Sequence, residues 1–370
     1  MDEKVQKFRG KEIIFLFDTN VYRRLIEMNE NSRETRTNML LFQMHIHERE
    51  NNCRVMRSLT TSQELISHLI EGDDSFGLCM EALKFQERHT QFEEKGLNSP
   101  SIDLLLLVFL YEEDVILNKN DVIISTLDKY RNYTDWLKHT IKKIVKIPHD
   151  SNVQKEIEKI KRNFSSYKKE FHELISRLLN SPSNTENEWD FFYKDKELIS
   201  FIADSRYLTF MKNYFVERTE LLSGTENKIS DEKIIEFGHV FKEALLHFRY
   251  LFTVLRQSGN QLKDITNNPW NFINDFQIVF EWCFVKYYYR EKNIEIVLVT
   301  EDKSGNFKTP IEKKEKEKKE IVFESMHDLN DNVWYTWQYF EFIGYNVDKS
   351  NPNKKIVKDR NGWVVQGVVT

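Results

Sequence analysis

Acidic side chains follow two strongly apolar segments that lie far apart in the chain. Asp18 comes directly after IIFLF (13–17), and Asp302 closes the β-branched segment IEIVLVT (294–300). We expect both segments to be buried strands of a parallel sheet. Functional sites in such sheets form outside the carboxyl ends of the strands. The two carboxylates would therefore meet at one edge if the strands are neighbours.

Two further acids lie on predicted helices that lead to the same edge. Glu64 is placed in the first turn of a helix that follows a second short strand (54–59). Asp275 is placed in the first turns of an apolar helix beginning after Pro269. Because Asp275 lies among Phe272, Ile273 and Phe276, we expect it to face an apolar interior, where a carboxylate needs a charged, hydrogen-bonded or metal partner.

Three of these acids also have purely structural interpretations. Thr61 and Glu64 have the spacing of a capping box, in which the glutamate only closes the helix start. Taken alone, that interpretation is the stronger one for Glu64. Asp18 could cap the following helix, and Asp302 could be a turn aspartate.

A cluster of these carboxylates predicts metal chemistry. Three or four carboxylates at one point stay ionised only if a cation neutralises them. Oxygen ligands without His or Cys select Mg²⁺ or Mn²⁺, and a pair of such ions can activate water against a phosphodiester. The pair His45 and His47 lacks a third ligand at suitable spacing, and the chain has no Gly-rich phosphate loop, GxSxG or HExxH.

Four segments together resemble the PIN-domain nuclease family, in that family's order. They are FLFDTNVYRRL (15–25), TTSQELISHL (60–69), NDFQIVFEW (274–282) and IVLVTEDKSGNF (296–307). The resemblance implies an α/β fold, a three-layer α/β/α core with a small parallel sheet. It covers only about 75 residues at the start and about 75 near the end. More than half of the chain separates Glu64 from Asp275, much more than the family usually leaves there.

The resemblance also implies roles for individual residues. Asp18 and Asp302 would be the central metal ligands, and Glu64 and Asp275 would complete the site directly or through water. Asn20 and Thr300 would position ligands or water. The nearby cations Arg23, Arg24 and Lys303 would meet substrate phosphates, although helix direction could equally turn either arginine to solvent.

The implied function is a metal-dependent nuclease, with RNA favoured over DNA as substrate by the resemblance alone. A toxin or phage-defence role rests on analogy. The alternative, from a different class, is a non-catalytic RNA-binding or scaffold protein on the same core. The four acids favour the enzyme.

The predicted organisation is a split domain. Residues 1–75 and 271–345 form the PIN-like domain, 76–270 form a large helical insertion, and 346–370 form a tail with a hairpin at Asn361-Gly362. Only 11 glycines and 6 prolines, with 13% aromatic residues, favour long helices over a turn-rich β fold. The segment IEKKEKEKKE (311–320) is expected to be a solvated or mobile connector.

Charge and hydropathy restrict the partners. The net charge of −5 gives no global attraction to nucleic acid, but residues 138–170 carry ten Lys/Arg against four Asp/Glu. That excess is equally typical of a solvated amphipathic helix. The insertion or the tail could bind a protein partner. The charged N-terminal segment, the three scattered cysteines and the lack of a long apolar run predict a cytoplasmic protein with no membrane association.

Overall fold

The computed structural model describes residues 2–27, 33–90, 135–180, 205–223, 270–301, 308–315, 318–325, 330–351, 354–358 and 364–365, with several positions between 232 and 244. Of the residues that the sequence predictions name, Asp302, Lys303, Asn361 and Gly362 lie outside these ranges. Among the described helices, none is both long enough and apolar enough to cross a bilayer.

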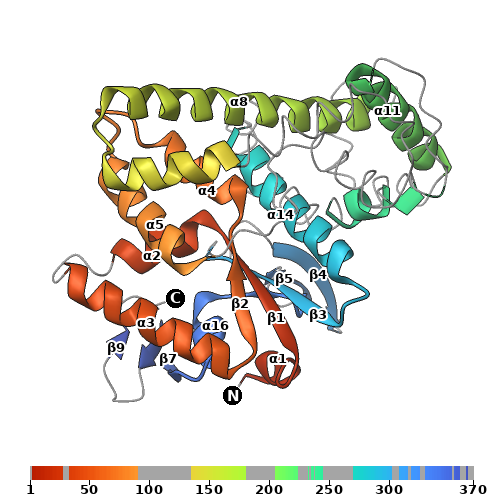
Figure 1. Ribbon diagram of the computed structural model, residues 1–370. Helices are drawn as coiled ribbons and strands as arrows, with labels where there is room; N and C mark the ends of the chain where they lie inside the picture. Colours follow the sequence, from red (N-terminus) through yellow and green to blue (C-terminus); the bar gives the residue numbers. More distant parts are fainter. Residues whose placement is uncertain are drawn as a thin grey trace.

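A four-stranded parallel sheet of order β2-β1-β3-β6 forms the centre of a mixed α/β, mostly helical fold (Figure 1). Its strands are β1 (Glu12–Phe17), β2 (Cys53–Met56), β3 (Ile294–Val299) and β6 (Val333–Trp334). The strands β1 and β3 pair along their full length, from Glu12 opposite Ile294 to Phe17 opposite Val299. The predicted central position of the 294–300 strand is confirmed.

Helices precede and follow the strands of this sheet along the chain. In the first part they are α1 (Glu3–Gln6), α2 (Thr19–Glu27), α3 (Arg33–Glu50), α4 (Leu59–Ser67) and α5 (Phe76–His89). Asn52 and Asn293 adopt positive φ immediately before β2 and β3. Asparagine tolerates this left-handed conformation better than most residues, so it suits the reversal from helix to strand.

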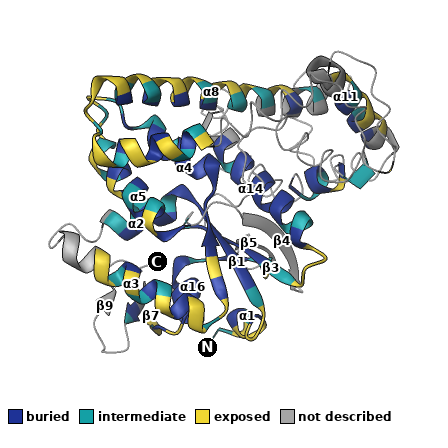
Figure 2. Ribbon diagram, in the orientation of Figure 1, coloured by how far each residue is buried: buried dark blue, intermediate teal, exposed yellow. Residues whose placement is uncertain are grey.

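The middle of the chain contributes long helices. They are a helix over 135–146, α8 (Ser151–Asn180) and α11 (Ser205–Ser223), followed by α14 (Trp270–Tyr289), which leads into β3. Figure 2 shows α8 with exposed residues on its outer side and buried ones toward α4. Because Ile157 and Ile160 of α8 belong to the same apolar core as Phe15 and Leu65, the middle of the chain is continuous with the core around the sheet.

Successive side chains of β1 point to opposite faces of the sheet, and those on both faces are packed against helices. Phe15 and Phe17 meet the ring of Tyr339 edge-on at 5.0 and 4.9 Å between centroids, from α16 (Thr336–Phe342). Leu16 is also buried, and α14 packs on the neighbouring strand β3, where Trp282 Nε1 donates to the Ile296 carbonyl. A strand buried on both faces explains the uninterrupted apolar run.

Three local predictions are changed or refined. The 311–320 segment forms part of an antiparallel hairpin, β4 (Lys308–Glu315) with β5 (Lys318–Ser325), so the expectation of a connector is wrong. The 54–59 strand ends at Met56, because Ser58 already caps α4. The tail forms an antiparallel sheet of β7 (Asn346–Asn351), β8 (Lys354–Lys358) and β9 (Val364–Val365), and the turn predicted at Asn361-Gly362 lies outside the described residues.

Replacing Phe15 with alanine should lower the free energy of unfolding by about 3–5 kcal/mol, the usual cost of emptying a buried aromatic site. Phe15 is 0% exposed and touches three aromatic rings. Chemical denaturation followed by circular dichroism measures the loss. Met39→Ala on exposed α3 is the control and should change stability by less than about 0.5 kcal/mol. Equal effects of the two substitutions would contradict this account of the core.

Candidate functional site

The carboxyl ends of β1 and β3 place Asp18 and Thr300 side by side. Each residue is the first after its strand, and Phe17 and Val299 are paired neighbours. The Asp18 N–H donates to the Val299 carbonyl at 3.0 Å, and Thr300 Oγ1 donates to Asp18 Oδ2 at 3.0 Å. The other carboxylate oxygen accepts from the Thr19 N–H at 2.6 Å. Both residues are buried, so these hydrogen bonds hold the Asp18 carboxylate in one orientation.

Thr19 links Glu64 to Asp18, because its hydroxyl contacts Glu64 and its backbone N–H contacts Asp18. Thr19 Oγ1 donates to Glu64 Oε2 at 2.6 Å, and Asn274 Nδ2 lies 3.4 Å from the other oxygen, Oε1. Helix α4 begins at Leu59 with Ser58 as its N-cap, whose hydroxyl accepts from the Thr61 N–H. Glu64 therefore lies in the second turn, and the capping-box interpretation of Glu64 is wrong.

Asp275 lies near this pair without the enclosed position expected for it. It is half-buried, and the buried polar side chain of that turn of α14 is its neighbour Asn274, at 8% exposure. The charges of both Glu64 and Asp275 act on Lys168 of α8. Burial lowers the pKa of Lys168, while these two carboxylates oppose the shift. One lysine of the middle segment thus lies within electrostatic reach of two predicted acids.

The remaining predicted residues fall on α2 or outside the described chain. Asn20, Arg23 and Arg24 lie half-buried on α2. Burial raises the pKa of the Cys79 thiol to about 11; Arg23 opposes that shift and Glu64 adds to it, so both side chains lie toward this part of α5. Asp302 and Lys303 lie beyond the last described residue of that segment, Glu301, whose Oε1 accepts from the Thr336 N–H that opens α16.

The donor set suits a hard divalent cation, since its side chains are carboxylates with threonine and asparagine around them. Within the described part of the chain, no group of three His, Cys, Asp or Glu side chains is arranged to hold a metal ion. Asp18 and Glu64 are brought together, Asp275 lies near Glu64, and Asp302 is outside the described residues.

A buried polar contact joins α14 to the start of α4, the helix that carries Glu64, and the sequence analysis did not predict it. Glu281 of α14 is 1% exposed, and its Oε2 accepts from Ser58 Oγ at 2.8 Å at the start of α4. Burial raises the pKa of Glu281 to about 7, while hydrogen bonds from Ser58, Thr60 and the Leu59 and Thr60 N–H groups oppose the shift. A glutamate between Phe280 and Trp282 was the available signal.

No family model, curated protein or solved structure matches this chain.

Glu281 should make stability fall as the pH rises. Its folded-state pKa of about 7 lies above the ordinary glutamate value of 4.5, so the folded chain holds a proton that the unfolded chain loses between these values. Its contribution is full below about pH 4.5 and declines by roughly 3 kcal/mol as the pH passes 7.

The neutral variant Glu281→Gln should remove that decline. Urea denaturation of both proteins from pH 5 to 8 measures it, as the difference in free energy of unfolding between them. Glu217→Gln, which changes an exposed acid of α11, should keep the wild-type pH dependence. A constant difference between wild type and Glu281→Gln across this range would contradict a raised pKa.

Proposed function

We propose that the chain is a Mg²⁺- or Mn²⁺-dependent nuclease with a PIN-like, three-layer α/β/α core, and that its substrate is RNA. The supporting observation is a set of hydrogen bonds at adjacent strand ends. Thr300 donates to Asp18, and Thr19, the residue after Asp18, donates to Glu64. Asp18, Glu64, Asp275 and Asp302 would hold the metal, which would supply an activated water and charge stabilisation at the phosphodiester. Asp302 enters through the family resemblance and its position after β3.

Neighbouring residues of the protein would orient the carboxylates that hold the metal. Thr300 fixes one oxygen of Asp18, and the backbone of Thr19 fixes the other. Such supporting hydrogen bonds set ligand direction, and losing one typically costs 10–100-fold in metal affinity or activity. Asn274 and Thr19 orient Glu64 in the same way.

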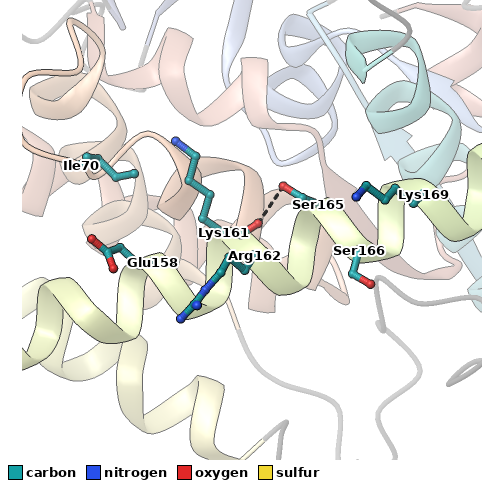
Figure 3. A pocket seen from close by; sticks show the side chains of 7 residues that line it. All are labelled: Ile70, Glu158, Lys161, Arg162, Ser165, Ser166 and Lys169. Atoms are coloured by element: carbon teal, nitrogen blue, oxygen red, sulfur yellow. Dashed lines mark hydrogen bonds between the residues drawn. The ribbon is translucent and has the colours of Figure 1, made fainter.

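A basic groove on α8 supports a nucleic-acid substrate. The groove, of about 540 Å³, is lined by Lys161, Arg162, Ser165, Ser166 and Lys169, with Glu158 and Ile70 at one end (Figure 3). Lys168, adjacent to Lys169 in the chain, acts on Glu64 and Asp275. Cations spaced along one helix suit the phosphates of one strand.

Removing the central acid should abolish cleavage. Labelled single-stranded RNA and DNA would be incubated with Mn²⁺, with and without EDTA. We expect metal-dependent cleavage that falls about 10²–10³-fold or more in Asp18→Asn and Asp302→Asn, as for loss of other charge-stabilising groups. It should fall about 10–100-fold in Thr300→Val. Asp331→Asn, in an exposed ion pair with Lys7, is the matched control and should keep full activity.

The same assay separates the two classes of function. Absence of cleavage with any metal, or full activity of Asp18→Asn, would refute the nuclease. RNA binding without cleavage would favour the alternative of a non-catalytic RNA-binding protein on this core.

Neutralising the basic groove should weaken RNA binding. In the triple variant Lys161→Gln, Arg162→Gln, Lys169→Gln we expect weaker binding and a salt dependence reduced by about 2 in slope, close to 0.7 per lost phosphate contact with a single strand. Filter binding in EDTA over a salt series measures this without cleavage.

The matched control removes two lysines and one arginine at the opposite end of the sheet: Lys11→Gln, Arg290→Gln, Lys292→Gln. These residues precede β1 and β3, where the strands begin. The control should bind RNA as the wild type does. Equal losses in both triple variants would show a general charge effect and contradict a groove on α8.

A further inference from the structure

A second cavity lies away from the carboxylates. It measures about 440 Å³ and is formed by α3, the edge strand β2 and the carboxyl end of α5. Cys53 on its wall pairs with Ile13, five positions before Asp18 on β1. At about 3.3 Å per strand residue, that pairing lies about 16 Å along the strand from the carboxylate edge. Val55, also on its wall, pairs with Phe15, about 10 Å along the strand from that edge. Among the described residues that line the cavity, none belongs to the candidate site.

The cavity carries a local positive charge in a chain of net charge −5. Three arginines line it, Arg49, Arg54 and Arg88, all exposed. Among the described residues that line it, the one carboxylate is Glu48, which is paired within the protein. Arginine presents a planar fork of donors that matches phosphate oxygens in pairs, so this wall favours a phosphorylated ligand.

The partners of Glu48 explain why it does not cancel the arginines. His89 Nε2 lies 2.6 Å from Glu48 Oε1, His45 Nδ1 lies 3.4 Å from Oε2, and the Tyr339 hydroxyl donates to Oε1. Burial alone would raise the pKa of Glu48, but the charge of His89 and these hydrogen bonds lower it to about 2. The carboxylate is ionised and already paired.

His89 also has capacity for another partner. It is 3% exposed and lines the cavity, and its Nδ1 has no hydrogen-bond partner in the part of the chain that the structure describes. A buried polar atom left without a hydrogen-bond partner is destabilising. A ligand that supplies a hydrogen bond here would remove part of that destabilisation.

The α3 side of the cavity also carries apolar and aromatic side chains. Phe42 is 68% exposed and Ile46 is 39% exposed, one turn apart on α3. Exposed side chains of this size at a cavity favour a ligand with a planar apolar part. The volume lies within the range of about 300–1,000 Å³ usual for small-molecule sites, much larger than one phosphate needs.

We propose that this cavity binds a mononucleotide, with its phosphate on the arginines and its base against Phe42. The ligand would also bear on the core of the sheet, because the ring of His89 contacts Phe17 at 5.6 Å between centroids, next to Asp18 in the chain. The nuclease activity is not required for this binding.

Titration calorimetry of the full chain in EDTA tests the proposal. The probes are the four ribonucleoside 5′-monophosphates, the four uncharged ribonucleosides and inorganic phosphate. We expect at least one monophosphate to bind at least tenfold more tightly than its nucleoside and than phosphate. Arg49→Gln and Arg88→Gln should each weaken that binding about tenfold, and Phe42→Ala should weaken it while leaving phosphate unchanged.

Two exposed substitutions serve as controls. Arg162→Gln reports on the basic groove of α8, and Met39→Ala reports on a neighbouring position of α3; both should leave the affinity unchanged. Failure of all four monophosphates to bind at millimolar concentration would overturn the proposal. So would equal losses in Arg162→Gln and Arg88→Gln, or phosphate binding as tight as any monophosphate. Because no metal is present, these outcomes are independent of whether the chain cleaves RNA.

Discussion

The in-register parallel pairing of β1 with β3 is the constraint on which the candidate site depends. It joins residues 12–17 to residues 294–299 and makes both strands end at the same level. Only then can Thr300 donate to Asp18 across the strand ends. A shift of one residue would move every side chain of β1 to the opposite face and take Phe15 and Phe17 away from the ring of Tyr339.

A second set of contacts fixes the position of α4 relative to α14 near that edge of the sheet. The Glu281 carboxylate is held at the start of α4 by Ser58, and one and a half turns further along α4, Glu64 meets Asn274 of α14. The two helices thus contact each other through polar groups at both ends of one seam. Buried polar contacts of this kind add little net stability but demand one arrangement, because any other leaves a charge unpaired.

Most of the strand framework could be predicted from the sequence, because β-branched and aromatic runs ending in Asp or Thr have few other interpretations. The meeting of Asp18 with Thr300 follows once β1 and β3 are neighbours in register, an adjacency that the sequence left conditional. The position of Glu64 in α4 could not be predicted, since the choice of N-cap between Ser58 and Thr61 depends on where β2 ends. The hairpin of β4 and β5 was missed because alternating Lys and Glu resemble a solvated linker.

The contribution of α8 was the hardest to predict, and it changes how the middle of the chain is understood. Composition alone left its basic residues equally consistent with a solvated face. Packing separates them: Ile157 and Ile160 enter the core, Lys168 lies within reach of Glu64 and Asp275, and Lys161 and Lys169 line the groove. A helix with only a packing role would need only the core residues Ile157 and Ile160. The charge of Lys168, partly buried within reach of Glu64 and Asp275, offsets some of the repulsion between these two carboxylates. The long segment between Glu64 and Asp275 thus supplies charge to the site that it separates in sequence.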